Sequence, residues 1–307
     1  MNLFATVLTY PAPSANYRGE SEENRTVIQK ITYGRFEYPI ISPEAIRNAL
    51  RETLASYALP CNRSRLHDEE QLAVKFKDYP DPDAYADDFF FGFLVAAGKD
   101  ERKKILEAVK KKGKAEADFR FKRDSVFRMN LARGVEPYRN NAIFTQSPLT
   151  SPDSPWQNAK TSALLHRETA LTAFQYPFAL NLDDCKAKPD WTKSLLKAIG
   201  ELNEVAGNHA RSYFEMAPAS IVVRLSTQLV AGYDTYGFKP QGNFPEVIDG
   251  ILEGDYPGKE FHIGGKIVKE MDAKQAESLK AQGVTLDRDP RRLLAAVGEK
   301  AFPKKRA

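Results

Sequence analysis

The stretch PIISPEAIRNALR, residues 39–51, joins a strand-like run to a helix with a clear start signal. Ser42 can cap the free N–H groups of the first helical turn, and Pro43 fits the first helical position. Glu44 adds negative charge at the positive end of the helix. We therefore predict an extended run that ends at Ile41 and a helix that begins at Pro43.

The apolar residues of this helix are spaced so that they share one face. At about 100° per residue, the residues on that side are Ile46, Ala49, Leu50, Thr53 and Leu54. Arg47 and Arg51 fall together along the edge of this apolar arc, so we expect both to flank the core without being buried in it. Guanidinium groups at a helix–sheet boundary suit phosphate binding, because each presents a fixed fork of donors. A solvated helix face is the alternative that the pattern leaves open.

The same stretch resembles a known family. A strand ending in PIIS and a helix reading PEAIRNALR are similar to the DevR-type CRISPR-associated backbone subunits, the "Cas seven" family of the RAMP superfamily. The resemblance spans residues 3–238 and lies in an ordered set of stretches rather than in one diagnostic motif. The order strand, strand, helix, insertion, strands, helix, strand agrees with an α+β fold: a ferredoxin-like, RRM-like βαββαβ core with large insertions.

Size and composition indicate a globular chain. Its 307 residues could form one large domain or two, and 42% apolar residues are enough for a sizeable core. Residues 89–98, the longest apolar stretch, are too short to span a bilayer, and residues 1–11 lack a leader pattern. We expect a cytoplasmic location and no membrane partner. Cys61 and Cys185 match no metal or disulfide spacing, so we expect both to be reduced and structural.

Charge is unevenly distributed, although the net charge is only +4. Residues 102–139 contain thirteen basic and five acidic residues, whereas residues 78–88 contain five aspartates and no Lys or Arg. Such segregation suits a chain whose copies meet head to tail while one face holds a polyanion. Solvated loops are an alternative for the acidic run.

The basic segment also carries polar side chains suited to a sugar-phosphate backbone. Phe119 to Lys122 alternates apolar and basic residues, which places Arg120 and Lys122 on one face of a predicted strand. The candidate contacts from here onward are Lys122, Arg123, Arg128, Asn130, Arg133 and Gln146. Mixed cations and short polar groups of this kind favour nucleic-acid contact over a merely soluble surface.

The aromatic run FFFGFL, residues 89–94, has some likeness to the base-stacking strip of an RRM. Asp87 and Asp88 precede it, however, where that strip carries a basic residue. We interpret the run as a buried strand or helix piece. The resembling family has a similar aspartate, phenylalanine and glycine stretch at this point.

The resemblance also implies where guide RNA would lie. In the family, the strand before the arginine-bearing helix and the helix itself line the guide groove, which implies contacts from Arg25, Lys30, Arg47 and Arg51. A turn with small residues, His and Arg before the last core strand is similar to the family pattern, and a glycine turn can approach a phosphate closely. It adds Asn208, His209 and Arg211. His166 and Arg167, at the end of the implied thumb hairpin, complete the set.

We expect residues 1–59 and 115–238 to form the core, or palm, with a protruding thumb β-hairpin near residues 145–166. Residues 60–114 are expected to be a finger-like insertion, because they are polar and poorly periodic. Residues 239–307 are expected to be a C-terminal extension with two extended pieces and a short helix.

The sequence thus predicts a non-catalytic backbone subunit of a type I, I-B-like CRISPR surveillance complex. As the resemblance implies, copies would polymerise along crRNA, hold its phosphate backbone and leave its bases free to pair with target DNA. The expected partners are crRNA, target DNA, further copies of the chain and other CRISPR-associated subunits. No cofactor or metal is expected, since the four histidines are scattered and no P-loop, nucleophile elbow or zinc signature is present.

Two alternatives remain. Type III backbone relatives cut target RNA with an aspartate and a divalent metal, and the acids nearest the expected groove are Asp87, Asp88 and Asp124. A generic single-stranded RNA-binding protein outside CRISPR systems would instead be a discrete monomer.

Overall fold

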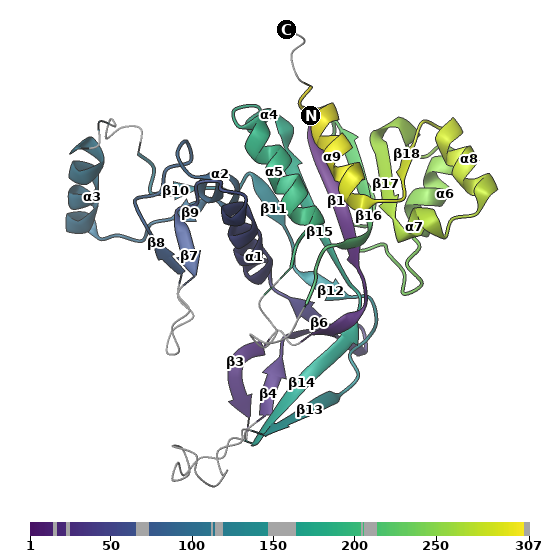
Figure 1. Ribbon diagram of the computed structural model, residues 1–307, viewed down its shortest axis with the longest axis horizontal. Coiled ribbons are helices and arrows are strands. Elements are labelled where there is room, and N and C mark those ends of the chain that lie inside the picture. Colours follow the sequence, from purple (N-terminus) through teal and green to yellow (C-terminus); the bar gives the residue numbers. More distant parts are fainter. Residues whose placement is uncertain are drawn as a thin grey trace.

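A large β-sheet forms the centre of the computed structural model, which describes residues 1–14, 17–22, 25–65, 74–111, 113, 119–146, 164–203, 205 and 214–303. Its strands follow the order β18-β17-β16-β1-β15-β12-β6-β5, and β11 also pairs with β15 (Figure 1). In sheet order, their bounds are β18 Thr285–Asp287, β17 Phe261–Gly265, β16 Pro218–Ser226, β1 Asn2–Thr9, β15 Phe174–Asn181, β12 Ala132–Gly134, β11 Phe127–Met129, β6 Phe36–Ile41 and β5 Lys30–Tyr33. The mixed α+β class that the sequence predicts is confirmed.

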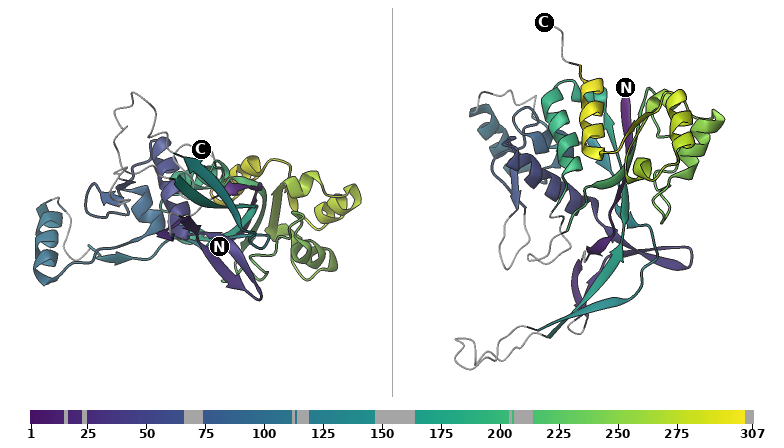
Figure 2. Two further views of the ribbon diagram at one scale, coloured as in Figure 1. Left: turned by 90° about the horizontal axis from the view of Figure 1, so that it is seen from below. Right: turned by 45° about the vertical axis from the view of Figure 1, so that its right-hand side comes forward.

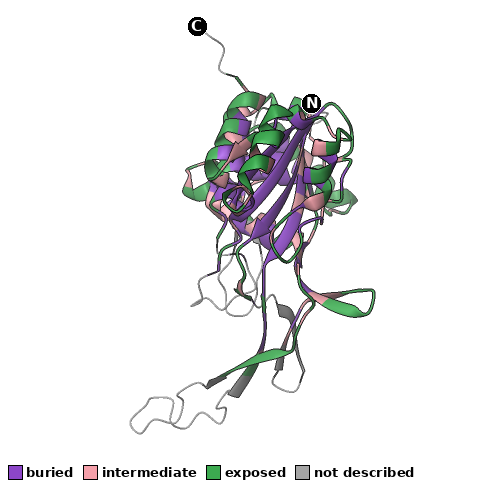
Figure 3. Cartoon of the chain, turned by 90° about the vertical axis from the view of Figure 1, so that its right-hand side faces the viewer, coloured by how far each residue is buried: buried purple, intermediate pink, exposed green. Residues whose placement is uncertain are grey.

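Strand β1 lies in the middle of this sheet, antiparallel to both β15 and β16. Ala5 is paired with Phe178 on one side and with Val223 on the other. Every residue of β16 is buried, as are Leu3 and Val7 of β1. Strands β1 and β16 therefore lie in the buried centre of the protein (Figure 3).

Three helices lie side by side over one face of the sheet: α1 Pro43–Ser56, α5 Pro189–Gly200 and α9 Pro290–Ala301 (Figure 1). Helix α1 begins as predicted, and the Ser42 Oγ accepts a hydrogen bond from the Ala45 N–H at 3.2 Å. In α5, Lys188 is at the N-cap position, Asp190 lies inside the first turn, and the helix ends at Gly200.

A smaller sheet extends from the lower edge of the body in Figure 1. Its strands are β13 Asn141–Gln146, β14 Leu164–Thr172, β4 Arg25–Ile28, β3 Tyr17–Glu22 and β2 Ala12–Ser14. The long β13–β14 hairpin reaches away from the helices (Figure 2). Residues 147–163, most of the expected thumb, lie outside the described residues.

Residues 61–123 contribute short elements on the opposite side of α1 from α5 (Figure 1). They are β7 Arg63–Arg65, β8 Val74–Phe76, α2 Ala86–Phe91, β9 Phe93–Leu94, α3 Lys99–Lys111 and β10 Lys122–Arg123. Helix α2 and β9 contain the aromatic run, and Phe89, Phe90, Phe91 and Phe93 are all buried. Its interpretation as a buried segment is confirmed for these phenylalanines, whereas Leu94 at its end is 70% exposed.

The C-terminal part is more helical than predicted. After β16 the chain forms α6 Pro245–Glu253, the 3₁₀ turn η2 Gly258–Glu260, α7 Lys266–Lys269 and α8 Ala273–Ala281. Strands β17 and β18 continue the large sheet, and Phe244, Phe261 and Ile263 belong to a second buried cluster there. The short helix α4 Leu182–Cys185 links β15 to α5.

Within the described ranges, no helix is long and apolar enough to cross a membrane.

Candidate nucleic-acid interface

Helix α1 carries the two arginines that the sequence places beside the core, and the structure separates their environments. Arg51 is 5% exposed, and its Nε donates to Oδ2 of Asp87 at 3.1 Å. Its Nη1 donates to Oδ1 of Asn48 at 2.5 Å. The expectation that both guanidinium groups lie outside the core is wrong for Arg51, because a buried carboxylate on α2 pairs with it.

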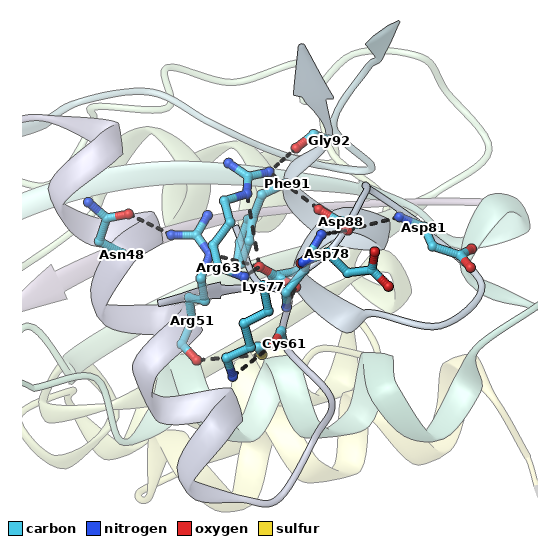
Figure 4. Close-up of polar contacts among 12 residues, drawn as sticks. Asn48, Arg51, Cys61, Arg63, Lys77, Asp78, Asp81, Asp88, Phe91 and Gly92 are labelled. Carbon is cyan, nitrogen blue, oxygen red and sulfur yellow. Dashed lines mark hydrogen bonds and ion pairs between the residues drawn. The ribbon is translucent and has the colours of Figure 1, made fainter. Parts of the chain in front are cut away.

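Arg51 belongs to a buried ion cluster of Arg51, Asn62, Arg63, Asp87 and Asp88 between α1 and α2 (Figure 4). Oδ1 of Asp87 accepts from the Asn62 N–H at 2.7 Å, and Oδ2 accepts from the Arg63 N–H at 2.9 Å. The Asp88 carboxylate accepts from Nδ2 of Asn62 at 2.8 Å. The cluster ties the start of the insertion to the helix that carries Arg47.

Burial sets the acid–base properties of this cluster. It lowers the pKa of Arg51, and the neighbouring Arg63 charge lowers it further. Burial also raises the pKa of Asp88 above the ordinary aspartate value. Both oxygens of Asp87 already accept protein hydrogen bonds, so this carboxylate is committed to holding the fold.

The remaining acid considered for metal binding, Asp124, is 81% exposed and lies 3.7 Å from the Lys122 ammonium. Within the described ranges, no group of three or more His, Cys, Asp or Glu side chains could hold a metal ion. Cys61 and Cys185 are buried free thiols, as expected.

Arg47 lies one turn before Arg51 and has a different environment. Its side chain is 25% exposed, and its Nη1 is 3.9 Å from the Glu44 carboxylate, which is itself 73% exposed. Its Nε is buried and makes no hydrogen bond. Exposed pairs of this kind are weak, so the Glu44 carboxylate holds the Arg47 guanidinium only loosely; its contact with a phosphate stays a prediction.

Lys30 does not project freely from its strand. Its Nζ is 2.9 Å from Oε1 of Glu168 and lies 4.4 Å from the centre of the Tyr138 ring. Glu168 is 1% exposed; burial pushes its pKa up, but hydrogen bonds from Tyr138, the Ile28 N–H and Lys30 outweigh this and lower it. Lys30 therefore neutralises a buried carboxylate that joins the two sheets.

The basic segment is less regular than predicted. Of the strand predicted at residues 119–122, only Lys122 lies in a strand: β10, which pairs Lys122 and Arg123 with Leu94 and Phe93 of β9. Arg120 and Lys122 are nevertheless both exposed, as the period of two predicts. The Arg123 guanidinium lies 5.5 Å from the Phe89 ring centre, and its Nε is buried without a hydrogen bond.

Two adjoining pockets of about 650 and 400 Å³ gather these cations. Arg120, Lys122 and Arg123 line the larger one, and Arg123 and Arg128 line the smaller one. The aspartates at 78, 81 and 83 line the larger pocket as well. The acidic and basic runs thus meet within one copy, so their separation in sequence no longer supports a head-to-tail arrangement.

Arg128 and Asn130 are exposed on and just after β11. Arg133, on β12, is half-buried instead, and its guanidinium carbon lies 4.7 Å from the Tyr236 ring centre. The two ends of this short stretch therefore differ: exposed polar side chains lie at one end and a cation stacked on aromatic rings lies at the other.

The smaller sheet brings other candidates together. Arg25 of β4 is paired in register with His166 of β14, which in turn faces Phe144 of β13. The His166 and Phe144 ring centres are 5.2 Å apart. Arg167 is half-buried next to His166, and Gln146 is the last residue of β13. Asn208, His209 and Arg211 lie outside the described residues.

Sequence reasoning missed two features. Arg63 joins the buried cluster, and its only sequence signal is its place in a polar insertion. Tyr33, Tyr38 and Tyr236 surround Arg133. Tyr33 and Ile31 are two residues apart, as are Tyr38 and Phe36, and this spacing could have identified an aromatic face of the hairpin. No local sequence signal connects that face to Tyr236.

Comparison with known proteins gives the following. No family model matches the chain. It is 28% identical over 292 residues to the "CRISPR-associated protein Cas7/Cst2/DevR" of Myxococcus xanthus (strain DK1622), an alignment that covers 91% of each chain. Among solved structures, a chain of a "CRISPR RNA-guided surveillance complex" has a TM-score of 0.58 at 13% identity, covering 98% of this chain and all of that one. A second, described as "pre-nicking", has the same TM-score and coverage at 14% identity. The two structures share the fold.

Proposed function

Because the chain is related along nearly its whole length to a Cas7/Cst2/DevR protein, as its sequence predicted, we propose that it is a crRNA-binding backbone subunit of a CRISPR surveillance complex. The single observation that carries this proposal is the relationship over 91% of both chains. The shared fold with chains of RNA-guided surveillance complexes supports it. Copies of the chain would coat the guide and leave its bases free to pair with target DNA.

The proposed core is the ferredoxin-like, RRM-like unit formed by β1, α1, β11, β15, α5 and β16. Helix α1 follows β1 and precedes β11, and these two strands lie on either side of β15. Helix α5 follows β15 and precedes β16, and these two strands lie on either side of β1. That arrangement supports a βαββαβ core. The β13–β14 hairpin is the proposed thumb, residues 60–114 the finger-like insertion and residues 239–307 the C-terminal extension.

The proposed guide contacts are cations and polar groups that suit a sugar-phosphate backbone. They are Arg25, Arg47, Lys122, Arg123, Arg128, Asn130, Arg133, Gln146, His166 and Arg167, with Asn208, His209 and Arg211. Lys30 and Arg51 act indirectly, because each pairs with a buried carboxylate and holds an element that carries a contact. Such side chains bind phosphate and sugar and carry little sequence information.

The subunit is proposed to be non-catalytic, of I-B-like type, and to assemble with further copies and with other CRISPR-associated subunits. The commitment of Asp87 to protein hydrogen bonds supports a scaffold over a metal-dependent nuclease. Head-to-tail polymerisation rests on the relationship alone, since the charge pattern no longer argues for it.

A binding experiment tests the proposal. The protein, freed of nucleic acid, is titrated into two labelled RNAs of equal length and unrelated sequence at several salt concentrations, with and without magnesium. Similar affinities, similar salt slopes and intact RNA are expected. Binding to only one of the sequences, or shortened RNA in magnesium, would contradict it.

A further inference from the structure

The β5–β6 hairpin presents an aromatic face to solvent. Tyr33 is paired in register with Phe36 beside the Gly34 turn, and Ile31 is paired with Tyr38. Because side chains alternate along each strand, these four lie on the same face. The tip is open: Tyr33 is 66% exposed and Phe36 is 58% exposed. Large aromatic rings exposed together at a hairpin tip are typical of a binding surface.

Arg133 lies against this face. The Arg133 guanidinium carbon is 5.6 Å from the Tyr33 ring centre and 5.7 Å from that of Tyr38, while Tyr236 covers it from another side at 4.7 Å. Tyr236 is fixed by a hydrogen bond from its hydroxyl to the Leu131 carbonyl at 2.7 Å. The guanidinium is thus held in one orientation by three rings.

No acid neutralises this cation in the described part of the chain. Arg133 makes no ion pair there, and its Nε is buried without a hydrogen bond. Glu37 alternates to the opposite face of the hairpin, where its carboxylate lies 3.8 Å from the Lys30 ammonium. Burial raises the pKa of Tyr236 to about 12, so its ring supplies no negative charge at neutral pH.

Exposed rings beside an unpaired, oriented guanidinium suit a flat ligand that carries a negative charge nearby. An unpaired nucleotide has this form: its base can stack on the rings, and its phosphate can contact the guanidinium. A purely apolar protein partner would bury the Arg133 charge without an anion, which is costly. The charge on this face therefore favours nucleic acid.

We propose that the face formed by Tyr33, Phe36, Tyr38 and Arg133 is a stacking site for an unpaired base of single-stranded nucleic acid, with Arg133 beside the adjacent phosphate. This rests on the proposed function and deepens it, because it adds base stacking to backbone contact. The base belongs either to the guide RNA or to the displaced or unpaired part of a DNA strand.

Photocrosslinking distinguishes these sources. One arm uses RNA with 5-iodouridine at scanned positions, and the other uses unlabelled RNA with a partly complementary DNA that carries 5-iododeoxyuridine in its unpaired part. Crosslinked peptides are identified by mass spectrometry in the full-length protein. We expect a crosslink to Tyr33 or Phe36 in one arm. The double variant Tyr33→Leu/Phe36→Leu should lose it and bind that nucleic acid about tenfold less tightly.

Tyr10→Leu is the matched control, since Tyr10 is 53% exposed and lies outside the hairpin; it should bind like the wild type. Nucleic acid bound with crosslinks only elsewhere, or an unchanged affinity of the double variant, would overturn the stacking site and leave the proposed function standing. A lower mass of the double variant without nucleic acid would mark the face as a protein interface and overturn it too. Failure of the wild type to bind any RNA would overturn both.

Discussion

Arg51 of α1 and Asp87 of α2 form a buried ion pair, with 3.1 Å between Nε and Oδ2, that joins the core helix to the insertion. Asp87 is fully buried, and removing it would leave Arg51 and Arg63 without their shared carboxylate. We expect Asp87→Ala to lower the free energy of unfolding by about 3–5 kcal/mol. Urea unfolding measures this. The exposed pair member Glu270 is the control, and Glu270→Ala should change little. Equal effects of the two substitutions would contradict a structural role for Asp87.

Arg47 and Arg51 should respond differently to alanine, although both lie on α1. Arg47→Ala should weaken RNA binding to a similar extent for unrelated sequences and reduce the salt slope by about one, while leaving the urea midpoint unchanged. Arg51→Ala should mainly lower stability. Lys269→Ala removes an exposed cation from α7 and controls for net charge. Unchanged RNA affinity and salt slope in Arg47→Ala would remove Arg47 from the interface.

His262 should make the protein less stable in mild acid. Burial, with the nearby Lys300 charge, lowers its pKa from 6.5 to about 4. Between these two values the unfolded chain binds a proton that the folded chain does not, so stability falls as pH drops through this window. His262→Asn should therefore show a flatter dependence of unfolding free energy between pH 6.5 and 4. Parallel curves for the variant and the wild type would contradict this.

Gly92 and Gly34 allow a test of a close backbone approach. Both have positive φ, 63° and 62°, so alanine is strained at each, and Gly92 has in addition a ψ of −175°, a region that essentially only glycine adopts. A Cβ at Gly92 would lie 2.4 Å from the Arg123 carbonyl oxygen, whereas one at Gly34 would meet nothing within 4 Å. Gly92→Ala should therefore lower the thermal midpoint more than Gly34→Ala does, and displace Arg123. Equal thermal shifts would show that the backbone at Arg123 can move away from residue 92 at little cost.

Local signals predicted the elements whose ends carry caps and periodic apolar residues. Helix α1 begins where Ser42 and Pro43 indicate, and the extended run before it ends at Ile41 as predicted. A comparable signal was overlooked in α6, where Pro245 precedes Val247, Ile248 and Ile251. The C-terminal extension was therefore predicted with too little helix.

The environment of the arginines could not be predicted in the same way. The burial of Arg51 depends on Asp87, which lies 36 residues away in a segment without clear periodicity. Likewise, Arg133 and Tyr236 meet only because distant parts of the chain fold together. The helical pattern predicts which face of α1 packs against the core. It does not predict which other segment of the chain packs beside that face and buries Arg51.

Coating of a guide RNA by copies of this chain is tested most directly by mass. The purified protein, freed of nucleic acid, is measured by light scattering with RNAs of increasing length, and the RNA is then recovered. The mass should rise in steps of one subunit as the RNA lengthens, and the RNA should be recovered intact. One copy per RNA at every length, or shortened RNA, would contradict the proposed coating.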